Sequence, residues 1–118
     1  MSVQQYAGSC QCGAVAYEAD LDLSATITCN CSRCRRLGSV LAFAPKAAFT
    51  LRSGEQNLTE YMFNQHTIHH LFCKTCGIQA FGFGTGRDGI EMVAVNANCL
   101  DGVDARALNS KAVDGASF

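Results

Sequence analysis

Seven of the eight cysteines in this chain fall into three short clusters, and thiolates at such spacings are typical ligands of soft metal ions. In chain order the clusters are a CxC, a CxCxxC and a CxxC motif: Cys10 and Cys12; Cys29, Cys31 and Cys34; Cys73 and Cys76. Because several thiolates from one turn of backbone can converge on one ion, we expect tetrahedral zinc.

Two clusters of two and one cluster of three divide most simply into a site of four thiolates and a site of three. The four-thiolate site would combine Cys10, Cys12, Cys73 and Cys76. All four positions of a tetrahedral ion would then be filled, so this site would contribute folding free energy and no chemistry. It is predicted to be a structural zinc site.

The remaining cluster of Cys29, Cys31 and Cys34 has no fourth ligand nearby in the sequence. Three protein ligands and one exchangeable position are typical of a catalytic zinc. A substrate thiol in that position would be held as a nucleophilic thiolate at neutral pH. Arg35 and Arg36 follow directly and are candidates for binding a substrate carboxylate, although two solvated surface arginines would look the same.

Other interpretations of the cysteines remain open at this stage. The CxCxxC cluster could hold an iron–sulfur cluster with an external ligand, recruit Cys99 into a second closed site, or act as metal-free redox thiols. A redox role for the CxxC motif would need a βαβ context, which is not visible, and disulfides would need an oxidising compartment. For Cys99 we favour a small buried apolar residue.

The histidines and aromatic residues carry a weaker signal. We expect none of His66, His69 and His70 to bind metal, because none lies at a ligand spacing from the cysteines. His69 and His70 are adjacent in an expected strand and should therefore face opposite ways. Five aromatic residues are expected in the core or in a pocket wall: Tyr17, Phe43, Phe63, Phe81 and Phe83.

The elements that must position these residues are predicted to be short, mostly antiparallel β-strands with little helix, in one domain spanning residues 1–118. One short helix is expected at 32–37, capped by Ser32 and ended by Gly38. Residues 104–118 are expected to be irregular. Alternating or apolar runs between turn signals predict strands at 14–19, 40–44, 58–63, 67–72, 78–83 and 90–97.

Composition excludes several classes of protein. With 118 residues, 48% hydrophobic residues and a net charge of −1, the chain is a folded domain without the positive charge that binds nucleic acids or anionic membranes. The sequence has no signal peptide and no apolar stretch long enough to span a bilayer. These features together with the clustered cysteines indicate a reducing, cytoplasmic setting, and they leave the oligomeric state open.

The clusters also resemble those of a known family, the glutathione-dependent formaldehyde-activating enzymes and their centromere protein V relatives. The resemblance covers about residues 6–102. It is carried by Cys10-Gln11-Cys12-Gly13, by residues 29–36, by Pro45-Lys46-Ala47-Ala48-Phe49, by residues 72–77 and by Asn98-Cys99-Leu100-Asp101. It departs at Asn30, where the family often has histidine; that position is not a ligand, so zinc binding should be retained.

The resemblance implies a β-tent fold of antiparallel sheets with zinc knuckles. It implies structural zinc on the four-cysteine set, and catalytic zinc on Cys29, Cys31 and Cys34. The implied activity is that of a carbon–sulfur lyase, which joins glutathione, or another small thiol, to formaldehyde or a similar small electrophile. A non-enzymatic zinc module that binds a protein partner is the alternative.

Overall fold

The computed structural model describes residues 3–64, 67–86 and 88–117. Ten short strands, one α-helix, α1 (Cys34–Leu37), and several 3₁₀ turns account for most of the described chain. The strands are β1 (Gln4–Ser9), β2 (Ala16–Leu21), β3 (Ile27–Cys29), β4 (Leu41–Pro45), β5 (Phe49–Ser53), β6 (Leu58–Tyr61), β7 (His69–Cys73), β8 (Phe81–Thr85), β9 (Glu91–Asn96) and β10 (Lys111–Val113). The mostly β fold predicted from the sequence is confirmed.

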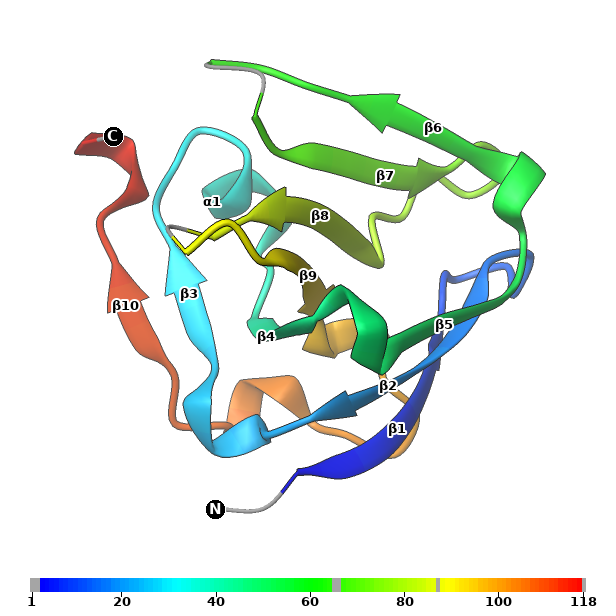
Figure 1. The fold of residues 1–118 in the computed structure, drawn as a ribbon, viewed down its shortest axis with the longest axis horizontal. Coiled ribbons are helices and arrows are strands. Elements are labelled where there is room, and N and C mark those ends of the chain that lie inside the picture. The colour runs from blue at the N-terminus through cyan, green and yellow to red at the C-terminus, as the bar shows by residue number, and fades with distance from the viewer. Residues whose placement is uncertain (1–2, 65–66, 87, 118) are drawn as a thin grey trace.

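The strands form two sheets that lean against each other around one core (Figure 1). The smaller sheet has the order β1-β2-β5, and the larger has the order β10-β3-β4-β9-β8-β7-β6. The described pairings are antiparallel except for β10 against β3, which is parallel. The chain passes from one sheet to the other several times, so residues distant in sequence meet at the ends of the strands.

Aromatic rings fill the space between the sheets. Tyr17 on β2 and Phe81 on β8 are each 1% exposed, and their ring centroids lie 5.5 Å apart. Phe49 packs against both rings, at 5.2 Å from Tyr17 and 4.7 Å from Phe81. Phe83 packs against Phe49 and is half-buried. The strands that carry the cysteine loops are therefore fixed by large apolar contacts.

Phe43 is the one expected core aromatic that lies on the surface, with 44% of its side chain exposed. Its neighbours on β4, Ala42 and Ala44, are buried. Successive residues of a strand face opposite sides of a sheet, so two buried alanines place the residue between them in solvent. The prediction for Phe43 was wrong because the apolar run at 40–44 hides this alternation.

The short helix ends as predicted but begins differently. Gly38 takes a left-handed conformation with φ of 67° and donates its N–H to the carbonyl of Cys34. The N-cap residue is Arg33, which makes no side-chain capping bond, so the predicted Ser32 cap was wrong. Ser32 lies instead in the turn that bends the chain between Cys31 and Cys34. The positions of the cysteines, not a cap, determine the path of this segment.

The chain after residue 103 is more regular than predicted. It forms a 3₁₀ turn at Ala105–Ala107, then β10, then a second turn at Gly115–Ser117. No helix among the described residues is long and apolar enough to cross a membrane.

Candidate metal centres

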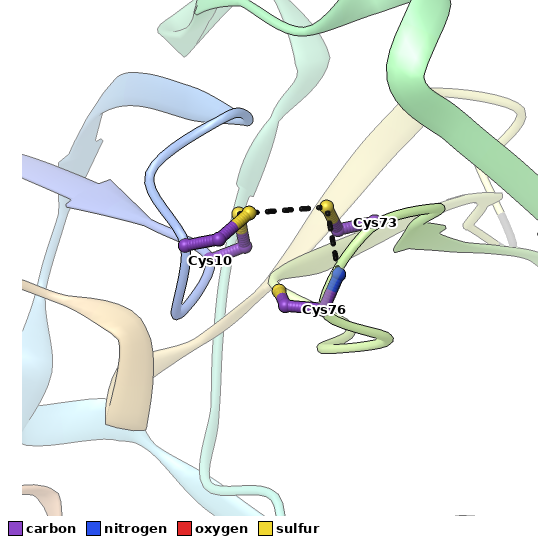
Figure 2. Close-up of side chains that lie close together, drawn as sticks. Cys10, Cys73 and Cys76 are labelled. Carbon is purple, nitrogen blue, oxygen red and sulfur yellow. Dashed lines mark hydrogen bonds between the residues drawn. The ribbon is translucent and has the colours of Figure 1, made fainter.

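The four-cysteine site is assembled from two loops that the sheets bring together. Cys10 and Cys12 lie in the turn between β1 and β2. Cys73 is the last residue of β7, and Cys76 lies in the turn that follows it. Figure 2 shows Cys10, Cys73 and Cys76 pointing toward one another from these two loops. The ligand atoms of all four residues lie within 4.8 Å of one another. The sequence prediction grouped the same four residues.

The sulfur separations fit a tetrahedral ion and exclude disulfides. Cys12 Sγ lies 3.6 Å from Cys10 Sγ and 3.7 Å from Cys73 Sγ. A tetrahedron with zinc–sulfur bonds of about 2.3 Å has edges of about 3.8 Å. A disulfide would require about 2.05 Å, and all eight cysteines are free thiols.

Backbone and side-chain donors prepare this site for thiolates. Cys73 Sγ accepts hydrogen bonds from the N–H of Thr75 at 3.3 Å and from the Asn57 amide at 3.3 Å. The pKa of Cys73 is lowered, chiefly by hydrogen bonding from the backbone of Cys76. Hydrogen bonding from the Ile78 backbone lowers the pKa of Cys76 to about 6. Metal binding requires deprotonated thiols, so this arrangement favours a bound cation.

The second site gathers Cys29, Cys31 and Cys34 where β3 turns into α1. Their sulfur atoms lie within 4.8 Å of one another, and each residue is half-buried. Among the residues that the structure describes, no fourth histidine, cysteine or carboxylate joins this group. The four-plus-three partition predicted from the cluster sizes is therefore confirmed as an arrangement of side chains.

The three thiols are electrostatically unequal. Burial works to raise the pKa of Cys31, but hydrogen bonds from the backbone of Cys34, from its thiol and from the backbone of Arg33 bring that pKa below its ordinary value. Burial raises the pKa of Cys34 to about 12. The pKa values of Cys31 and Cys34 therefore shift in opposite directions, and a bound cation would favour the ionised form of both thiols.

Ser39 is an unpredicted neighbour of this site. Its side chain is buried, with 4% exposed, and its hydroxyl has no hydrogen-bond partner among the described residues. Its interaction with Cys34 lowers the pKa of that thiol and opposes the effect of burial. A buried hydroxyl facing a thiol suits a thiolate ligand better than a neutral S–H. This observation supports metal binding by the three cysteines.

A pocket of about 340 Å³ lies beside α1. Arg36 lines it, whereas Arg35 is exposed and is not among the lining residues. Arg36 Nη1 donates to the backbone carbonyl of Ser32 at 2.7 Å. The pocket combines polar residues of the cysteine segment with apolar and aromatic side chains: Ser32, Arg33, Arg36, Leu37, Tyr61 and Phe63.

Arg33 is the residue in this pocket that the sequence prediction missed. Its Nε donates to Gln79 Oε1 at 2.8 Å, and its guanidinium lies 4.8 Å from the centroid of the Tyr61 ring. These contacts hold the head group in place and leave its terminal nitrogens available for a ligand. The position of Arg33 between two of the clustered cysteines was visible in the sequence. Its contacts with Tyr61 and Gln79, far along the chain, were not.

The two described histidines take different positions, as their adjacency predicted. His70 is buried, with its ring stacked on Phe63 at 5.1 Å, and His69 is exposed and pairs with Glu60. His66 lies outside the described residues. Cys99 is half-buried against the core, outside both cysteine groups, and burial raises its pKa to about 11.

Comparison with known proteins gives two findings. A family model described as "Glutathione-dependent formaldehyde-activating enzyme" matches residues 5–113. A crystal structure of a Rhodobacter sphaeroides protein is 37% identical, with a TM-score of 0.80. The match covers 90% of this chain and 97% of that one. The family match spans the two cysteine groups.

Proposed function

This chain belongs to the glutathione-dependent formaldehyde-activating enzyme family, and we propose that it forms or cleaves a carbon–sulfur bond between a small thiol and formaldehyde or a similar electrophile. The family name implies an enzyme that acts on glutathione and formaldehyde. The convergence of three thiols without a fourth described protein ligand carries the proposal. Such a group leaves one position for a substrate thiol.

In the proposed site Cys29, Cys31 and Cys34 hold zinc, and Cys10, Cys12, Cys73 and Cys76 hold a second, structural zinc. When bound at the open site, zinc supplies Lewis-acid stabilisation of a substrate thiolate at neutral pH. The substrate sulfur attacks the aldehyde carbon, the carbon–oxygen π electrons move to oxygen, and the oxygen takes up a proton. The product is an S-hydroxymethyl thioether, and the reverse steps release the aldehyde.

The chain's own residues bind the remainder of the thiol. Arg36 in the pocket provides positive charge for a substrate carboxylate, and the exposed Arg35 next to it in the chain adds to that charge. Arg33, already held by Gln79 and Tyr61, presents a second guanidinium with little remaining freedom. Tyr61 and Phe63 form an apolar wall. A carboxylated thiol of the size of glutathione matches this combination of charge and apolar surface.

Two broader features of the proposal follow from the same residues. Seven clustered free thiols would persist in a reducing compartment, which supports a cytoplasmic location. One core, shared by both sheets, supports a single zinc-binding domain over residues 1–118.

The proposal is tested by zinc content and by exchange between formaldehyde, glutathione and their adduct, followed by magnetisation-transfer NMR. We expect two zinc ions per chain and accelerated exchange. Cys31→Ser should lose one zinc ion and the accelerated exchange together. Cys99→Ala, which lies outside the two cysteine groups, should keep its full zinc content and the accelerated exchange. Full zinc loading and no acceleration with any small thiol would contradict the enzymatic role and favour a zinc module for protein interaction.

A further inference from the structure

The C-terminal segment reaches the open site through a short parallel pairing. β10 runs beside β3, and Val113 is the register partner of Cys29 (Figure 1). The start of this segment is anchored by a hydrogen bond of 2.8 Å between the hydroxyls of Ser110 and Thr26, of which Thr26 is buried. The family match ends at residue 113, and residues 114–117 lie beyond it.

Asn30, between two of the site's cysteines, binds the segment at three points. Its backbone N–H donates to the carbonyl of Val113 at 3.3 Å. Its side-chain Nδ2 donates to Asp114 Oδ1 at 3.0 Å, and its Oδ1 accepts the N–H of Ala116 at 2.9 Å. Both ends of the amide side chain are therefore occupied by the C-terminal segment, which indicates a specific attachment.

Gly115 lies directly on the site. A Cβ atom at this position would come within 2.4 Å of Cys29 Sγ and 3.5 Å of Cys31 Cβ. The glycine backbone is thus in contact with a ligand sulfur, and any other residue would displace the segment or the sulfur. One side of the three-thiol group is covered by main chain.

The cover is held almost entirely by polar contacts. Asp114, Ala116 and Ser117 are exposed, and Gly115 is half-buried. Asp114 Oδ2 also accepts a hydrogen bond of 2.6 Å from the Ser117 hydroxyl, which closes the turn on itself. Because little apolar surface is buried here, the segment can open locally without unfolding the core.

We propose that residues 113–117 form a cover over the three-cysteine site, that Asn30 is the positioning residue that holds it, and that the cover selects by size which molecules reach Cys29. A small aldehyde or a slender thiol passes the closed cover, whereas a bulky molecule requires it to open. The consequence for substrate choice rests on the proposed function. The shielding itself is a property of the fold and can be tested without turnover.

The test measures alkylation of Cys29 in reduced, metal-free protein by peptide mass spectrometry, with iodoacetamide as the small reagent and a polyethylene glycol maleimide as the bulky one. Asp114→Ala removes the acceptor for Asn30. The same change removes the acceptor for the Ser117 hydroxyl. We therefore expect the bulky reagent to react at least about three- to tenfold faster, the factor typical of one lost hydrogen bond, and the small reagent to change much less. Asp104→Ala, an exposed aspartate earlier in the same region, is the control and should leave both rates unchanged.

Exchanging the amide and the carboxylate between Asn30 and Asp114 distinguishes loss of this hydrogen-bonded pair from a general disturbance of the site. Asn30→Asp places a carboxylate against Asp114 and should speed bulky alkylation. Adding Asp114→Asn restores a donor and an acceptor, so the double variant should return toward the original rate. Equal rates for all variants, or a double variant as fast as Asn30→Asp alone, would overturn the proposal.

Hydrogen exchange of the unaltered protein gives an independent measurement if a variant fails to fold. The Ala116 amide should be protected, because it donates to Asn30. Exchange of that amide at the rate of an unstructured peptide would also refute the cover. Failure of the formaldehyde reaction would contradict the proposed function and leave these rates unaffected.

Discussion

Single side chains tune each thiol differently, and Ser39 shows how. Its buried hydroxyl lowers the pKa of Cys34, which burial raises to about 12. A donor to a thiolate stabilises the ionised form and fixes the direction of its lone pairs. The effect concerns one ligand of one site, so it should be measurable without disturbing the rest of the molecule.

We therefore expect Ser39→Ala to weaken zinc binding at the open site by about 10- to 100-fold, as is typical when a partner of a metal ligand is removed. Competition with a chromogenic chelator would measure this, and zinc at the four-cysteine site provides the internal reference. Ser32→Ala, at an exposed serine in the turn before α1, should change neither affinity. An unaltered affinity in Ser39→Ala would show that the hydroxyl does not act on the bound state.

His70 is a second residue whose surroundings decide its charge. Burial lowers its pKa below 6.5, and the positive charge of Arg33 lowers it further. The unfolded chain therefore binds a proton at this position before the folded protein does. The contribution of His70 to stability is fully present above pH 6.5 and is lost as the pH falls from 6.5 toward the folded pKa.

NMR titration of the His70 ring should accordingly give a pKa below 6.5, and Arg33→Gln should raise it. Arg35→Gln, two residues further along the chain and exposed, should leave the pKa of His70 unchanged. If Arg33→Gln left the pKa of His70 unchanged, that result would contradict the placement of the Arg33 guanidinium beside Tyr61 and Gln79.

At the scale of elements, two glycines with left-handed backbone separate conformational strain from steric clash. Gly77, after the last cysteine of its loop, has φ of 79° and open space where a Cβ would lie. Gly54, before a 3₁₀ turn, has φ of 90°, and a Cβ there would lie 2.4 Å from the carbonyl oxygen of Ala14. Position 77 therefore requires only a residue that adopts a positive φ, whereas position 54 also requires a residue without a Cβ atom.

We expect Gly77→Ala to lower the free energy of unfolding by about 1–2 kcal/mol, the cost of a left-handed conformation with a Cβ. Gly54→Ala should cost clearly more, because the β1–β2 turn must also move. Denaturant titration of the zinc-loaded proteins compares the two. Equal losses would mean that the hairpin adjusts freely around residue 54.

The elements also show what sequence could and could not predict. Strands with dense apolar patterns, such as β9, were predicted within a residue or so. β1, rich in glutamine, β3, with only three residues, β5, and β10, in the irregular-looking tail, were not predicted, because pairing with neighbouring strands stabilises them and their own sequences carry a weak strand pattern. The two cysteine groups were predictable from spacing alone. Arg33, Ser39 and the C-terminal cover were not, since their partners lie far away along the chain.

At the scale of the whole molecule the two cysteine sites differ in what they connect. The four-cysteine site joins positions such as Cys12 and Cys73, which are 61 residues apart, and links the small sheet to the large one. The three-cysteine site lies within residues 29–34 and closes no long loop. Cross-linking a long loop restricts the unfolded chain far more than cross-linking a short one.

Metal removal should therefore have two separate consequences. By the same entropy argument that applies to disulfides, a link across 61 residues is worth about 4 kcal/mol, before any bonding energy of the metal is counted. Cys73→Ser should lower the Tm by 10 °C or more, on the order that such a loss implies for a small domain. Cys29→Ser removes a ligand of the short site and should shift the Tm by only a few degrees, on the same scale.

Calorimetry with parallel zinc analysis would measure both variants, and Cys99→Ala would show the cost of losing a half-buried cysteine that lies in neither group. A stepwise chelation of the unaltered protein should repeat the order. The three-thiolate site loses its ion first while the fold persists, and unfolding accompanies loss of the second ion. If Cys29→Ser proved as destabilising as Cys73→Ser, the division into one site for stability and one for chemistry would be wrong, because the open site would then also hold the sheets together.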